Sequence, residues 1–65
     1  MERYITLTLR HDGWFADFHN DEEIRQLFGS TVLPTAYTAN AAPLVVLHAI
    51  RKLNPGLRVT IGPAL

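Results

Sequence analysis

The chain has 65 residues, of which six are basic, six are acidic and none is cysteine, so its formal net charge at neutral pH is zero. This length leaves room for one small domain, and the lack of cysteine excludes disulfides and thiolate metal sites. Neutrality argues against a protein that binds nucleic acid mainly through its phosphates. The hydrophobic share of 48% predicts a folded chain, whereas a charged share of only 18% leaves surface for a partner.

No part of the chain is typical of a membrane protein. The sequence has no apolar run of about 18 residues, the length of a membrane span. Its first four residues do not begin the apolar stretch of a signal peptide. We therefore expect a cytoplasmic protein with no membrane partner.

The first twenty residues predict a β-hairpin. Apolar and polar residues alternate from Tyr4 to Arg10, as in a half-buried strand, and Asp12-Gly13 favours a two-residue turn. With that turn, the predicted cross-strand pairs are His11 with Trp14, Leu9 with Ala16 and Leu7 with Phe18. This register places the apolar members of both strands on one face of the sheet.

A short helix follows the hairpin. Asn20 or Asp21 is a suitable N-cap, two acidic residues occupy the first turn, and Gly29 stands where the helix must end. Residues 30–39 are the least regular stretch. Within them, Thr31-Val32-Leu33 fits a small strand that Pro34 would end.

The second half of the chain predicts a longer amphipathic helix and a final strand. Asn40 is the expected N-cap and Pro43 falls in the first turn, where a missing N–H costs little. Apolar residues then recur at helical spacing, and Asn54-Pro55-Gly56 ends the helix near Leu53 or Asn54. Strict alternation over residues 57–61 predicts the strand.

These elements predict a single α+β domain over residues 1–65, a two-layer sandwich with the order β-β-α-α-β. The connection rules give a three-stranded mixed sheet of order 2-1-3, in which the first strand is antiparallel to both neighbours. Both helices are expected to cover one face of this sheet.

The succession of strand, Asp12-Gly13 turn, strand and helix resembles the small partial-ribonuclease-H-like fold of HicB-type antitoxins. The resemblance covers the first twenty residues and the long helix. The chain departs from that fold because a helix stands where a third strand is expected and because a strand closes the domain. No family is therefore assigned.

The second face of the predicted sheet has no element left to cover it. It carries the aromatic and charged side chains of Tyr4, Arg10, Phe15 and Arg58. Aromatic anchors beside arginines are typical of protein-binding surfaces, although an ordinary solvated sheet face shows the same alternation. Tyr37 is a further candidate, which either contacts a partner or folds over the core.

The edges of the predicted sheet are also candidates for association. The second and last strands keep unpaired backbone groups, and Arg58 is the only charge that guards the last strand. Pairing with a second copy or with a partner's strand is one interpretation, and a short, protected edge is the other. The small size of the chain favours a homodimer.

The sequence contains little that indicates a catalytic or metal-binding site. His19 lies two residues from Asp17, a spacing that suits a metal-ligand pair or a base with its orienting acid, but two ligands do not make a site. Ser30 and the threonines lack a neighbouring histidine–acid arrangement. We predict no catalytic residue, metal, cofactor or small-molecule substrate, and little room for a ligand pocket.

The sequence thus predicts a noncatalytic protein-binding or adaptor module that acts through the open sheet face or an edge strand and associates with itself. The alternative is a nucleic-acid-linked regulator of antitoxin type. That alternative requires the basic side chains to form one patch despite the neutral total, namely Arg3, Arg10, Arg51, Lys52 and Arg58.

Overall fold

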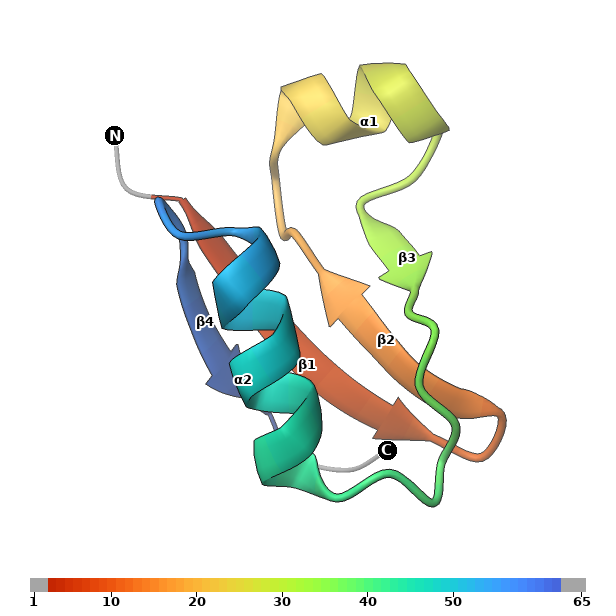
Figure 1. Cartoon of the computed structure of the whole chain (residues 1–65). Coiled ribbons are helices and arrows are strands. Elements are labelled where there is room, and N and C mark those ends of the chain that lie inside the picture. The colour runs from red at the N-terminus through yellow and green to blue at the C-terminus, as the bar shows by residue number, and fades with distance from the viewer. Residues whose placement is uncertain (1–2, 63–65) are drawn as a thin grey trace.

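Two helices and four strands make up the chain in the computed structural model, which describes residues 3–62 (Figure 1). In chain order these elements are β1 (Tyr4–Arg10), β2 (Gly13–Asp17), α1 (Glu22–Phe28), β3 (Val32–Pro34), α2 (Pro43–Leu53) and β4 (Arg58–Ile61). The predicted α+β class is confirmed. Neither helix in the described part of the chain is long and apolar enough to span a membrane.

The sheet has the strand order β3-β2-β1-β4. The predicted order of the second, first and last strands is correct, but the prediction of three strands is wrong, because β3 adds a fourth beside β2. β3 is antiparallel to β2 and so reverses the chain once more before α2. For this reason β4 runs parallel to β1, whereas we expected it to be antiparallel.

The residues after α1 follow β2 along its whole length. Phe18 N donates to Thr31 O at 2.7 Å, Thr35 N donates to Trp14 O at 3.0 Å, and Trp14 N donates to Tyr37 O at 3.1 Å. Only three residues of this segment are a regular strand, and the last of them is a proline. Its backbone nevertheless forms hydrogen bonds with the backbone of β2. β2 is therefore an inner strand and not the edge strand that the sequence predicted.

The hairpin between β1 and β2 keeps the predicted faces but not the predicted register. Leu9 pairs with Trp14 and Arg10 with Gly13, so each pairing is displaced by two residues and the turn lies at His11 and Asp12. A displacement of two leaves every side chain on its face, since the strand period is two. Gly13 instead begins β2 with a φ of 137°, a value that favours glycine.

The core lies between α2 and one face of the sheet. Its buried members are Ile5, Leu7, Trp14, Ala16, Val46, Leu47, Ile50 and Val59. Burial of each large aliphatic side chain contributes about 1.5–3 kcal/mol, so this layer supplies most of the stability. The polar group of the buried Trp14 side chain has a hydrogen-bond partner, because its indole N–H donates to Ala41 O at 3.1 Å.

Helix α2 ends where the sequence predicts but begins later. Ala42, not Asn40, is the N-cap, and it forms no side-chain hydrogen bond, while Pro43 is the first helical residue. Asn40 lies inside a turn in which Ala41 N donates to Thr38 O at 3.1 Å. The fixed φ of proline therefore starts the helix, without a side-chain cap.

Helix α1 does not cover the sheet. Its predicted cap is confirmed, since Asp21 accepts from Glu23 N and Ile24 N, and Gly29 ends it with a φ of 77°. However, α1 buries none of its residues and lies beyond the ends of β2 and β3 (Figure 1). The prediction of two helices on one face is therefore wrong. Because α1 connects the adjacent antiparallel strands β2 and β3, it stays at the end of the sheet where β2 ends and β3 begins.

Candidate functional site

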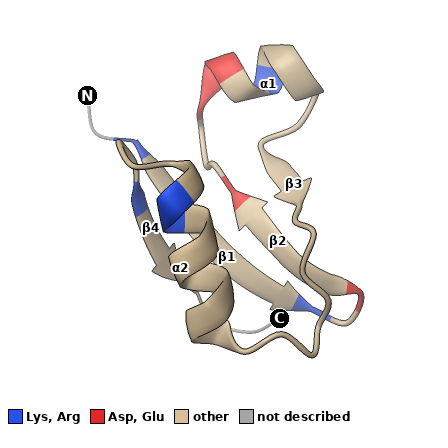
Figure 2. Ribbon diagram, viewed as in Figure 1, with Lys and Arg blue, Asp and Glu red and all other residues tan. Residues whose placement is uncertain are grey.

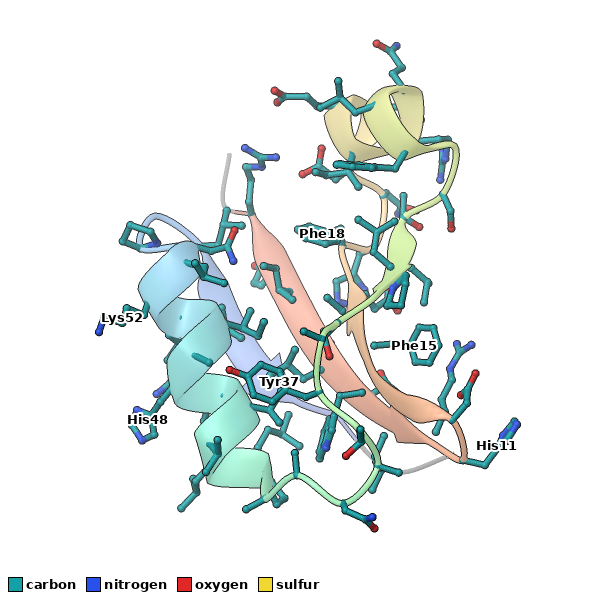
Figure 3. The ribbon with its side chains drawn as sticks, turned by 45° about the vertical axis from the view of Figure 1, so that its right-hand side comes forward. His11, Phe15, Phe18, Tyr37, His48 and Lys52 are labelled. Atoms are coloured by element: carbon teal, nitrogen blue, oxygen red, sulfur yellow. The ribbon has the colours of Figure 1, made fainter. Side chains whose placement is uncertain are left out.

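Four of the five predicted partner-binding residues share the sheet face that α2 leaves uncovered. Tyr4 and Arg58 are neighbours on β1 and β4, and Arg10 and Phe15 lie on β1 and β2. All four alternate with side chains of the core, which places them opposite α2. Figure 3 shows Phe15 on the side of the sheet away from α2.

The two pairs lie at opposite ends of β1. Tyr4 and Arg10 are its first and last residues, which places them about 20 Å apart at the usual rise of an extended strand. Thr6 and Thr8 lie between them on the same face. The open face thus carries two aromatic residues, each next to an arginine, with hydroxyl groups in between.

Arg10 and Phe15 make direct contact. The guanidinium carbon lies 4.9 Å from the centre of the Phe15 ring, which is within range of a cation–π interaction. Arg10 Nε is buried and has no hydrogen-bond partner among the described residues. The ring therefore stabilises the guanidinium, and its remaining N–H groups can donate hydrogen bonds to a carboxylate.

Tyr37 belongs to the other side of the sheet. It is half-buried and packs against the core cluster, and Figure 3 shows its ring beside α2. The structure does not bring it together with the other four predicted residues. Of the two interpretations of Tyr37 that the sequence left open, its position agrees with the one in which it folds over the core.

A pocket of about 860 Å³ lies where β1 begins, below the N-terminus of α1. Its lining includes Tyr4 and Thr6 from the open face, Phe18 and His19 from the end of β2, and acidic residues of α1. The expectation of little room for a pocket is wrong, because α1 projects beyond the sheet and leaves this space. The pocket continues the open face at Tyr4.

His19 lines this pocket in a well-defined position. Its φ of 58° is left-handed, and Asp17 Oδ1 accepts from His19 N at 2.8 Å. The ring lies edge-on to Tyr4 with centroids 6.4 Å apart, and Nε2 is 2.7 Å from Thr6 Oγ1. Asp17 therefore holds the backbone of His19 and not its ring, contrary to the spacing-based hypothesis of a base with its orienting acid.

The Thr6–His19 contact has the length of a nucleophile–base pair, and the sequence analysis missed it. A hydrolytic triad also needs a group that orients the other ring nitrogen. Within residues 3–62, no carboxylate is hydrogen-bonded to Nδ1 of His19. The nearby Asp17 accepts from the backbone N–H of His19 instead. No group of three or more potential metal ligands occurs among residues 3–62. His11 lies at the hairpin turn and His48 on the outer side of α2 (Figure 3), whereas His19 follows the end of β2.

One ion pair joins the start of β1 to α1 at the rim of the pocket. Arg3 Nε and Nη2 donate to Asp21 Oδ2 at 2.9 and 2.6 Å, and Glu23 lies 3.8 Å from the same guanidinium. The hydrogen bond from Arg3 holds the pKa of Asp21 below its ordinary value and raises the pKa of Arg3. This contact links the N-cap of α1 to the residue that precedes β1.

The outer edge of β4 is partly covered by Arg51, which the sequence analysis did not consider for this role. Arg51 of α2 donates from Nε and Nη2 to Val59 O at 3.4 and 3.3 Å. This carbonyl points away from β1, so the arginine occupies an acceptor that a partner strand would need. Addition of a strand at β4 therefore has to displace Arg51.

A comparison with known protein families, curated proteins and solved structures finds no match to this chain. We therefore infer its function from the geometry of its own residues.

Proposed function

We propose that this chain is a noncatalytic, cytoplasmic protein-binding or adaptor module that binds a partner through its open sheet face. The observation that carries this proposal is the placement of the Tyr4–Arg58 and Arg10–Phe15 pairs on one face. Aromatic residues and arginine are the side chains that contribute most to protein interfaces. The complementary partner surface presents carboxylates near apolar side chains.

The position of the pocket supports the same face. Tyr4 and Thr6 belong both to the open face and to the pocket lining. A partner side chain that enters the pocket would thus contact the sheet at the same time.

Site-specific photo-crosslinking tests this proposal. A photoactivatable phenylalanine analogue replaces Thr8, between the two pairs, and in a control replaces Gln26 on the polar side of α1. We expect an adduct with one protein from position 8 and not from position 26. The same adduct from both positions would overturn the proposal.

Recombinant partner then allows a quantitative test with Phe15→Ala. We expect about tenfold or greater loss of affinity by calorimetry, because truncation of an aromatic residue that anchors an interface costs about 2 kcal/mol or more. The circular dichroism spectrum and urea midpoint of the variant should remain close to those of the wild type. Unfolding by this change would place Phe15 in the core and contradict the assignment.

A nucleic-acid-linked regulator is the second candidate. It is supported by the arrangement of basic residues, since Figure 2 shows them at the end of α2 and at the start of β4, near the start of β1. These residues are Arg51, Lys52 and Arg58. Arg10 lies at the other end of β1 and Arg3 is paired with Asp21. Phosphate binding predicts an affinity that falls steeply with salt concentration. An affinity for DNA or RNA that does not change with salt would exclude this candidate.

A further inference from the structure

Both helices expose large apolar side chains that no described part of the chain covers. On α1, Leu27 is 68% exposed and Phe28 is 61% exposed. On α2, Leu44 is 65% exposed and Val45 is 55% exposed. These four side chains lie outside the open sheet face, so a partner bound there leaves them in water. Exposed apolar surface of this kind is typical of an interaction site.

Four of the exposed residues of α2 form one stripe. Val45, His48 and Lys52 follow one another at three- and four-residue spacing, and Leu44 lies one turn before His48. Figure 3 shows His48 and Lys52 directed away from the sheet. We name these four residues the α2 stripe. It is apolar at its start and basic at its end.

The start of α1 carries the opposite charge, and its Glu23 also lies 3.8 Å from the guanidinium of Arg3. Glu23 lies one helical turn before Leu27, so the acidic residue borders the apolar pair Leu27 and Phe28. We name these three residues the α1 surface. Figure 2 shows the acidic residues at the start of α1 and the basic residues at the end of α2. Lys52 makes no ion pair within residues 3–62.

A second copy of the chain is the partner that matches both surfaces. A basic partner would match the α1 surface and an acidic partner the α2 stripe, but each would leave the other surface exposed. Two identical copies related by a two-fold axis bring each surface against its complement twice. The zero net charge of the chain means that two copies do not repel each other.

We propose that two copies associate through their helices, with the α1 surface of each packed against the α2 stripe of the other. An antiparallel arrangement places Glu23 beside Lys52 and Leu27 and Phe28 beside Val45. It also sets the positive end of the α1 dipole near the negative end of the α2 dipole. This dimer shares Glu23 with the lining of the pocket but leaves the strand residues of the open sheet face free, so it does not depend on the proposed function.

Charge reversal with mixing tests the proposal. We would measure solution mass by light scattering behind a sizing column over about a hundredfold range of concentration. The samples are the wild type, Glu23→Lys, Lys52→Glu and an equimolar mixture of the two variants. Asp12→Lys, at the hairpin turn, is the control for a change of net charge.

We expect the wild type and Asp12→Lys to dimerise alike. Each single reversal should weaken dimerisation by about tenfold or more, because it places like charges together at both contacts. The mixture should regain the wild-type association, since each variant then supplies the charge that the other lacks. This recovery separates an interface effect from a folding defect, which mixing cannot repair.

Three outcomes would overturn the proposal. The first is a wild type that remains a 7.3 kDa monomer over the whole range. The second is a dimer that neither reversal weakens, and the third is a mixture that stays as weak as its components. A dimer lost in Phe15→Ala but retained in Lys52→Glu would assign self-association to the sheet face instead.

Discussion

The two helices of this chain have similar apolar spacing but different surroundings. Helix α2 buries Val46, Leu47 and Ile50 against the sheet, whereas α1 buries no residue and is held by its caps and by the Arg3–Asp21 ion pair. A helix of seven residues has little stability by itself. The difference shows that an amphipathic pattern predicts a helix but not the surface that the helix will cover.

This difference separates the functions of the two regions. The layer made of α2 and the sheet supplies the stability of the fold. The α1 surface and the open sheet face contribute little burial, so they are available for binding. Changes at the two helices should therefore have very different effects on stability.

The largest expected effect comes from truncation of the α2 core. Leu47→Ala and Ile50→Ala each remove a buried side chain and should lower the free energy of unfolding by about 2–5 kcal/mol. Leu27→Ala on α1 is the matched change at an exposed site and should cost less than about 0.5 kcal/mol. Urea denaturation followed by circular dichroism measures all three. Equal losses at Leu27 and Leu47 would show that α1 is packed as firmly as α2.

A smaller effect is expected where the 31–37 segment meets the hairpin. A Cβ at Gly13 would lie 3.0 Å from Tyr37 O, and the φ of 137° disfavours any other residue. Gly13→Ala should therefore cost about 1–3 kcal/mol, measured by the same denaturation experiment. Gly56→Ala is the control, because a Cβ there meets nothing within 4 Å. A neutral Gly13→Ala would mean that this segment does not pack on β2 as described.

The smallest effect is expected at the ion pair that holds α1, and it depends on pH. The folded-state pKa of Asp21 is lowered by Arg3. The contact therefore stabilises the fold above the unfolded-state pKa of about 3.9, and this stability is lost as the pH falls through the lower folded-state value. Asp21→Asn keeps a good N-cap but removes the charge.

We expect Asp21→Asn to be less stable than the wild type at pH 7 and nearly equal to it at strongly acidic pH. Thermal melts at the two pH values, together with the amide chemical shifts of α1, measure this difference. Asp12→Asn, at an exposed turn, should melt like the wild type at both. A constant difference between Asp21→Asn and the wild type at every pH would show that the charge of Asp21 is not responsible.

Much of the fold follows from short-range rules. Alternation identifies β1 and β4, Asp21 and Gly29 cap α1 as predicted, and Asn54 ends α2. The hairpin shows the limit of such rules. Alternation determines the face of each strand residue, but a shift of two residues conserves every face, so it cannot determine the register.

The missed features depend on contacts between distant residues. β3 has three residues and ends in a proline, so its signal is weak, yet its hydrogen bonds to β2 change the sheet order and the position of α1. The shared face of Tyr4 and Phe15 follows from alternation. The pocket and the Thr6–His19 contact do not, because they require the left-handed backbone of His19 and a helix that projects past the sheet.

Native-state hydrogen exchange tests the contrast between the helices most directly. It would be measured residue by residue at a concentration where the chain is monomeric, with increasing low concentrations of urea. We expect amides of residues 46–50 to exchange only through global unfolding, with a strong dependence on urea. Amides of residues 25–28 should exchange much faster and with little dependence on urea. Equal protection of both helices, with the same urea dependence, would show that α1 is as stably packed as α2.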